Sequence, residues 1–133
     1  MRSIDAVITW VDGSDEDYKK KIENHLSKST NYKKHYLQAN EIEYCVKSIL
    51  RFAPFVRRIF IVTDNQKPSF KGLEDLIVSN KVKIVDHKEI FRGYEKYLPT
   101  FNIRSIDAVL HRIEGLSEMF VYFNDDVFLI NKI

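Results

Sequence analysis

Several features that would quickly assign a protein to a class are scarce or missing in this sequence. It has one cysteine, Cys45, which excludes an internal disulfide and fits a reducing compartment. Cys45 falls on the apolar side of an expected helix, so we interpret it as a small core residue rather than a nucleophile. No apolar run approaches the roughly 20 residues that a membrane-spanning helix needs. We therefore expect no membrane span.

A large excess of charge is also missing. The formal net charge of the 133 residues is only +2, which is too small to indicate nucleic-acid binding. The composition, 44% apolar and 30% charged, is that of a soluble globular protein, and the length allows one core. We expect a single α/β domain over residues 1–133. A strand pattern begins almost at once and leaves no room for a signal peptide. We therefore expect a cytoplasmic protein, either free or peripheral at the inner face of the membrane. The alternative is a fragment without its targeting segment.

The familiar phosphate-binding loops are absent. The sequence contains no GxGxxG and no GxxxxGK[ST], which argues against a dinucleotide-binding dehydrogenase and a P-loop NTPase. It also lacks the Gly-x-Ser-x-Gly turn of α/β hydrolases and a cysteine–histidine metal cluster. A ligand site in this chain therefore has to be built from other groups.

The pattern that is present alternates short apolar strands with amphipathic helices. Strands are expected at residues 4–11, 58–63, 82–85 and 120–123. Helices are expected from Ser14 or Asp15 to about Leu26, after the capping residue Asn40, at 73–78 and from Asn102 to Gly115, with an aromatic loop between Lys88 and Phe101. This order predicts a mainly parallel, Rossmann-like sheet with helices on both faces. The chain stops at Ile133, soon after the last strand, and we expect the complete protein to continue.

Each expected strand ends in polar or acidic residues. These are Asp12 and Asp15, then Asp64 and Asn65, then Asp86 and His87, and finally Asn124, Asp125 and Asp126. In a parallel sheet these endings share one edge, where ligands bind. Crowded carboxylates repel one another unless a cation lies among them, so we favour a metal or nucleotide site over a solvated edge. Asp125 and Asp126 are the strongest candidates for a divalent metal, because Mg²⁺ prefers carboxylate oxygens.

Other residues near this edge leave alternatives open. Arg104 and Arg112, together with Arg57 and Arg58, could neutralise the acidic edge or clamp a diphosphate. His87 is a candidate base or ligand as well as a candidate structural residue. Trp10 is more often a core residue, but near a strand end it could stack on a base or sugar.

Ordered motifs along the chain resemble one known family. They lie at residues 4–15 (Ile-Asp-Ala-Val-Ile-Thr-Trp-Val-Asp-Gly-Ser-Asp), 48–64, 86–88, 98–102 and 111–128. Together they resemble the first and second conserved blocks of the Stealth family. Its members are sugar-1-phosphate transferases of microbial capsular polysaccharide synthesis, related to the α/β subunit of lysosomal-enzyme N-acetylglucosamine-1-phosphotransferase. Two further blocks of the family, downstream in its members, are not in this sequence.

The resemblance implies a catalytic core that uses a UDP-sugar and Mg²⁺ or Mn²⁺, transfers a hexose-1-phosphate to a hydroxyl of a polysaccharide or glycan acceptor, and releases UMP. On this reading Asp125 and Asp126 hold the metal, and Arg104 balances phosphate charge. Asn124 shapes the turn, and His87 is the candidate base. The loop on the nucleotide side contains Trp10, Asp12, Gly13 and Asp15. The alternatives are a metal-dependent glycosyltransferase that releases UDP and a non-catalytic module that binds a nucleotide-sugar or a partner subunit; the oligomeric state stays open.

Overall fold

The fold is a four-stranded parallel sheet. The computed structural model describes residues 3–11, 41–64, 66–94, 109–124 and 129–131. Its strands are β1 (Ile4–Thr9), β2 (Val56–Thr63), β3 (Val82–Asp86) and β4 (Met119–Asn124), and every neighbouring pair runs parallel. The expected parallel α/β architecture is confirmed.

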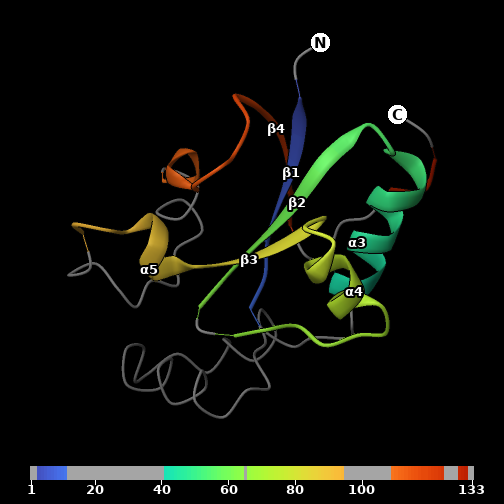
Figure 1. Ribbon diagram of the computed structural model, residues 1–133, viewed down its shortest axis with the longest axis horizontal. Helices are drawn as coiled ribbons and strands as arrows, with labels where there is room; N and C mark the ends of the chain where they lie inside the picture. The colour runs from blue at the N-terminus through green and yellow to red at the C-terminus, as the bar shows by residue number, and fades with distance from the viewer. Residues whose placement is uncertain (1–2, 12–40, 65, 95–108, 125–128, 132–133) are drawn as a thin grey trace, which may run out of the picture.

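The order of the strands determines where a ligand crevice lies. The sheet runs β3-β2-β1-β4, so β1, β2 and β3 step in one direction and β4 lies on the opposite side of β1 (Figure 1). The point between β1 and β4 is therefore a topological switch point. In open parallel sheets, ligands bind outside the carboxyl ends of the strands at this point.

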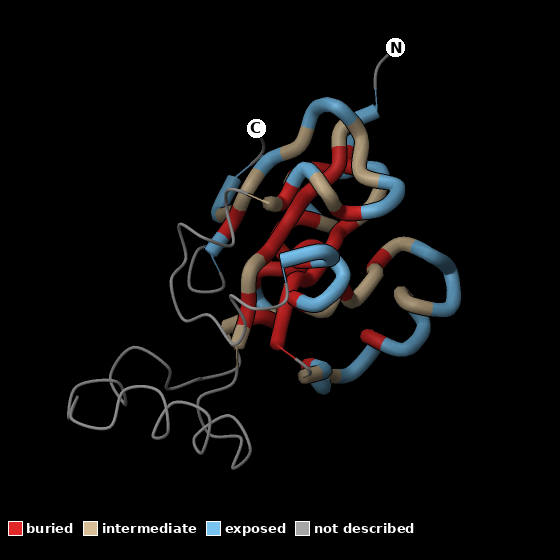
Figure 2. Tube along the Cα trace, turned by 90° about the vertical axis from the view of Figure 1, so that its left-hand side faces the viewer, coloured by how far each residue is buried: buried red, intermediate tan, exposed pale blue. Residues whose placement is uncertain are grey.

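Helices pack on both faces of the sheet, as expected. Helices α3 (Glu41–Phe52) and α4 (Leu73–Val78) contribute to one core cluster, and α5 (His87–Ile90) and the 3-10 helix η2 (Leu110–Arg112) contribute to the other. Successive residues of a strand point to opposite faces, so Ala6 and Ile8 belong to the α3 side while Val7 belongs to the α5 side. The buried strands form the centre of the molecule between these two layers (Figure 2).

The apolar periodicity of the sequence accounts for α3. Ile42, Cys45, Val46 and Ile49 recur at helical spacing, and all four are buried against the sheet. Pro54 follows the end of the helix, as the pattern predicted. Cys45 is fully buried, which confirms its interpretation as a core residue.

Three expectations about element boundaries were wrong or only partly tested. The first strand ends at Thr9, two residues early, although the N–H of Trp10 still donates to the Val62 carbonyl over 2.9 Å. The stretch after β3 begins with helix α5 instead of a loop, because the side chain of Asp86 accepts a hydrogen bond from the Lys88 N–H at 2.9 Å and caps this helix. The helix expected from Asn102 lies largely outside the described residues, and its described end is η2.

A buried carboxylate joins β1 to its neighbours at the amino-terminal edge of the sheet. Asp5 is 0% exposed; its Oδ1 accepts from Arg57 Nε at 3.0 Å and from the Arg58 N–H at 3.2 Å. Its Oδ2 accepts from an Arg57 terminal nitrogen (Nη2) at 2.8 Å and from the Ser117 N–H at 2.9 Å. The same Arg57 nitrogen donates to the Gly115 carbonyl at 2.8 Å. We call this arrangement the Asp5 clasp: Asp5, Arg57, the Arg58 and Ser117 N–H groups and the Gly115 carbonyl.

The electrostatics of the Asp5 clasp favour the ionised acid. Burial alone would raise the pKa of Asp5, but hydrogen bonds from Arg57 and Ser117 and the charge of Arg57 outweigh it, so the pKa lies below its ordinary value. Lys81 contacts the same segment, because its Nζ donates to the carbonyls of Val56 and Arg57. Burial lowers the pKa of Lys81, and the negative charge of Asp5 opposes this shift. The clasp thus fixes the start of β2 and the entry to β4 against β1.

Candidate functional site

The carboxyl ends of the strands meet at one edge, as the sequence predicted. Thr9 is the register partner of both Val62 in β2 and Asn124 in β4, and Thr63 is the partner of Asp86 in β3. The polar strand endings that the structure describes, namely Asp64, Asp86, His87 and Asn124, therefore lie along this edge. Asn124 is exposed and lies directly at the switch point between β1 and β4.

A chain of side-chain hydrogen bonds crosses the switch point. The hydroxyl oxygens of Thr9 and Tyr122 are 2.7 Å apart, and the Tyr122 hydroxyl donates to Asn124 Oδ1 at 2.9 Å. Thr9 and Tyr122 are both partly buried, and their hydrogen bond joins β1 to β4. Neither residue was singled out from the sequence. The available signal was a hydroxyl two residues before Asn124 and another at the end of the first strand, but it is informative only once β1 and β4 are known to be neighbours.

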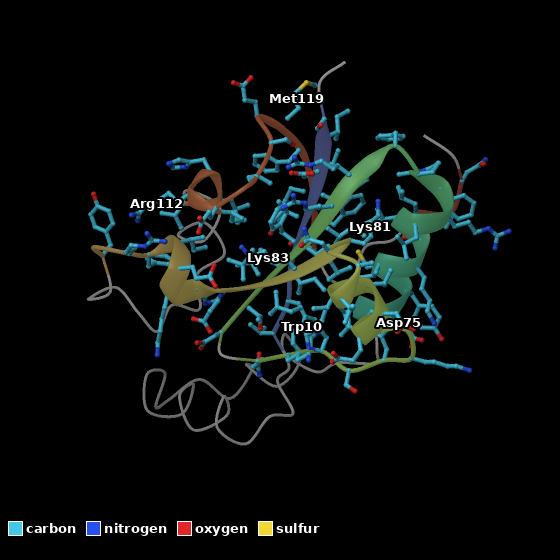
Figure 3. The ribbon with its side chains drawn as sticks, in the orientation of Figure 1. Trp10, Asp75, Lys81, Lys83, Arg112 and Met119 are labelled. Atoms are coloured by element: carbon cyan, nitrogen blue, oxygen red, sulfur yellow. The ribbon has the colours of Figure 1, made fainter. Side chains whose placement is uncertain are left out.

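Trp10 belongs to the core of the protein in this structure. It is 7% exposed and packs in the cluster on the α3 side, and Figure 3 labels it below the sheet at its carboxyl edge. Its burial matches the more common role of a tryptophan near a strand end. Stacking on a base or sugar stays a prediction, and it would require the indole to leave the core cluster.

Two titratable groups at this edge are more buried than we would expect for side chains on a solvated edge. His87 is 2% exposed in the first turn of α5, and Asp64 is 7% exposed directly after β2. The environment of His87 is that of a packed structural histidine, and its role as a base stays a prediction. Asp86 is engaged as the cap of α5, so its place at the edge has a structural reason.

Arg57 and Arg112 form hydrogen bonds with groups other than the carboxylates of the acidic edge. Arg57 pairs with Asp5 at the opposite edge of the sheet. Arg112 donates to the carbonyls of Ile90 at 2.8 Å and Arg92 at 2.5 Å, which ties η2 to the end of α5. For Arg57 the expectation that it neutralises the acidic edge or clamps a diphosphate was therefore wrong, and for Arg112 it stays a prediction. Each satisfies polar groups within the fold.

The remaining candidate site residues lie outside the described residues. These are Asp12, Gly13, Asp15, Arg104, Asp125 and Asp126. Among the residues that the structure does describe, no group of three or more His, Cys, Asp or Glu side chains could hold a metal ion. In the sequence, Asp125 and Asp126 follow Asn124 directly, and Asp12 comes two residues after Trp10. Both carboxylate segments thus continue from the two strands that border the switch point.

Over the ranges that are described, no helix is long and apolar enough to cross a membrane.

Comparison with known proteins gives matches over most of the chain. Residues 2–29 match the model of Stealth protein conserved region 1, and residues 35–133 match that of conserved region 2. The chain is 46% identical over 132 residues to capsular polysaccharide phosphotransferase fcs1 of Haemophilus influenzae, a match that covers 95% of this chain and 35% of the relative. It is 44% identical over 131 residues to exopolysaccharide phosphotransferase SCO6021 of Streptomyces coelicolor, covering 95% of this chain and 23% of the relative.

A third relative, capsular polysaccharide phosphotransferase cps1A of Actinobacillus pleuropneumoniae, is 43% identical over 138 residues, with 98% of this chain and 36% of the relative covered. The chain thus spans about a third of the length of the first two capsular relatives. The family models together cover both the β1 segment and the segment from α3 to β4. The chain belongs to the Stealth family.

Proposed function

We propose that this chain is the donor-binding part of a phosphotransferase of capsular or cell-surface polysaccharide synthesis. The donor is a UDP-sugar, the transferred group is a hexose-1-phosphate, and the acceptor is a hydroxyl of a glycan. The names of the relatives, which are capsular or exopolysaccharide phosphotransferases, support the reaction class. Because the chain spans only part of those relatives, groups from elsewhere in the protein complete the acceptor side.

The observation that carries this proposal is the position of Asn124. It ends β4 at the switch point, in register with Thr9 at the end of β1, and the Asp125–Asp126 pair follows it in the sequence. A ligand crevice is expected here from topology alone. The carboxylates that follow Asn124 in the sequence would act on a diphosphate bound at this point through a cation.

Mg²⁺ or Mn²⁺ fits the donor set of this segment, because two aspartate carboxylates are hard oxygen ligands. We propose Asp125 and Asp126 as its ligands. When bound, the ion would neutralise charge on the diphosphate and on the leaving UMP. The protein's own contribution is to position the donor and to exclude water, which are the main sources of rate in phosphoryl transfer.

In the proposed reaction an acceptor oxygen attacks the phosphorus that carries the sugar. The bond from this phosphorus to the bridging oxygen of the diphosphate breaks, and the electron pair leaves with UMP. The acceptor hydroxyl loses its proton to a base. His87 is our candidate for this base, and its burial means that it would act only after a rearrangement of α5.

The nucleotide released by the full-length protein tests the proposal. The protein is incubated with UDP-N-acetylglucosamine and other UDP-hexoses, Mg²⁺ or Mn²⁺ and a capsular polysaccharide acceptor, and the products are separated by anion-exchange chromatography. UMP formed in step with phosphodiester in the polymer is the expected result. Release of UDP would contradict it, because UDP forms only if the sugar–oxygen bond breaks as in a glycosyltransferase. Binding without either product would point to a non-catalytic module.

A further inference from the structure

The hydroxyl groups of Tyr122 and Thr9 form a polar contact on an otherwise apolar part of the sheet. Both side chains lie on the α5 side of the sheet, where the neighbouring residues Val7 and Phe120 are apolar. A Val or Phe at these positions would fill similar space. The two hydroxyls instead form a continuous hydrogen-bonded chain that ends on the exposed side chain of Asn124.

The direction of the hydrogen bonds follows from the number of protons available. A tyrosine hydroxyl has one hydrogen, and in Tyr122 it is donated to Asn124 Oδ1. The Thr9 hydroxyl must therefore donate to the Tyr122 oxygen across the 2.7 Å contact. The chain runs from β1 to β4 and delivers a donor to the amide oxygen of Asn124.

This direction determines which part of Asn124 faces the crevice. The oxygen and the NH2 group of an amide point to different sides of its carbon, so an oxygen held by Tyr122 turns the NH2 group away from the Tyr122 hydroxyl. The NH2 group carries two donors and no acceptor, which suits an anionic oxygen and not a metal ion.

From this geometry we infer that Tyr122 and Thr9 are positioning residues that orient the Asn124 amide, so that its NH2 group donates to a phosphoryl oxygen of the bound diphosphate. The inference rests on the proposed function, since it requires a diphosphate at the switch point. It separates Asn124 from the neighbouring carboxylates: Asn124 binds the phosphate directly, whereas Asp125 and Asp126 act through the cation. Hydrogen bonds to a charged oxygen are stronger than neutral ones, so the orientation of one amide affects catalysis measurably.

A double-mutant cycle in the full-length protein tests the inference. Tyr122→Phe removes only the hydroxyl, and Asn124→Ala removes the amide. The kcat/KM for the UDP-sugar is measured for both single variants and the double variant. We expect Tyr122→Phe to lower kcat/KM about three- to tenfold, the range of one ordinary hydrogen bond. In the Asn124→Ala background the same change should alter kcat/KM less than about twofold, because the two residues act as one unit.

Further variants distinguish orientation from a structural effect. Thr9→Val should lower kcat/KM in the same direction as Tyr122→Phe, and Thr9→Ser, which keeps the hydroxyl, should restore it. Asn124→Asp still accepts from Tyr122 but has no NH2 group, so it should be at least as impaired as Asn124→Ala. Tyr44→Phe, at an exposed position of α3, is the matched control and should leave kcat/KM unchanged. Melting temperatures within about 2 °C of the wild type would show that the losses do not come from unfolding.

The outcomes separate the two proposals. If the wild-type protein releases UMP and Tyr122→Phe has the same effect with and without Asn124, the orienting role is refuted while the proposed function stands. An Asn124→Asp variant with wild-type kcat/KM would also refute it, because the NH2 donor would then be dispensable. If the wild-type protein forms no UMP under any condition tested, the proposed function fails, and this inference fails with it.

Discussion

Removing the carboxylate of Asp5 tests how much the Asp5 clasp contributes to stability. In Asp5→Ala, the Arg58 and Ser117 N–H groups lose their acceptor, and the guanidinium of Arg57 loses both of its bonds to the acid. The side chain of Arg57 is 39% exposed, so water can solvate it again. The Arg58 and Ser117 N–H groups are partly buried, so water replaces their lost acceptor only in part. These two groups therefore determine the loss of unfolding free energy.

The magnitude follows from these two donors. A buried donor left without a partner costs about 1–3 kcal/mol, and the partial burial here favours the lower half of that range. Two such groups give about 2–4 kcal/mol of lost unfolding free energy. A typical domain has only about 5–15 kcal/mol in total, so the loss is large enough to measure without abolishing the fold.

The pH dependence provides a second signature. The pKa of Asp5 is lower in the folded state than in the unfolded chain, so its contribution is fully present above the unfolded-state pKa of about 3.9. This contribution disappears as the pH falls through the folded-state pKa. Between pH 7 and pH 3 the wild-type protein should therefore lose more stability than Asp5→Ala.

Urea unfolding followed by the fluorescence of Trp10, the single tryptophan of this sequence, measures both effects. Asp75→Ala is the control, because Asp75 is an exposed aspartate in the first turn of α4 (Figure 3), where we expect a change below about 1 kcal/mol. An Asp5→Ala variant within about 1 kcal/mol of the wild type, or one that keeps the full acid dependence, would show that the clasp does not stabilise the fold as described.

Three shorter predictions concern other parts of the chain. Asp125→Ala or Asp126→Ala should abolish metal-dependent UDP-sugar binding in calorimetry while the melting temperature is kept; unchanged affinity in both would remove the pair from the site. Gly115→Ala should cost about 1–2 kcal/mol in urea unfolding, because Gly115 has φ +85° and an L-residue is strained there; a cost near zero would contradict this. Cys45, fully buried in α3, should react with Ellman's reagent only as fast as the protein unfolds, and rapid reaction of the native protein would contradict its place in the core.

The sequence predicted correctly those elements that are determined by residues close together in the chain. The apolar stripe of α3 repeats several times within one helix, and α4 was predicted at residues 73–78, where the structure has it. Helix α5 was missed because four residues are too few to show a period. Its one signal, the capping side chain of Asp86, was interpreted as part of the acidic edge.

Non-local partners explain what the sequence did not predict. Asp5 was treated as an ordinary member of an apolar strand, although a carboxylate inside such a run needs a partner. That partner, Arg57, is 52 residues away, and it was assigned to the opposite edge of the sheet. The Thr9–Tyr122 contact likewise depends on β1 and β4 being neighbours, which apolar periodicity does not specify.

The strand order has a consequence for the sequence of folding events. The contact between Asp5 and Arg57 closes a loop of 52 residues, whereas the contact between Thr9 and Tyr122 closes one of 113. Doubling a flexible loop adds only about 0.6 kcal/mol of closure entropy, but non-local parallel pairing is slow to form. We expect β1, β2 and β3 to associate first and β4 to dock afterwards. During synthesis, β1 would then be folded before β4, the other strand that borders the switch point, has docked. The ability to bind a donor would therefore appear as one of the last events of folding.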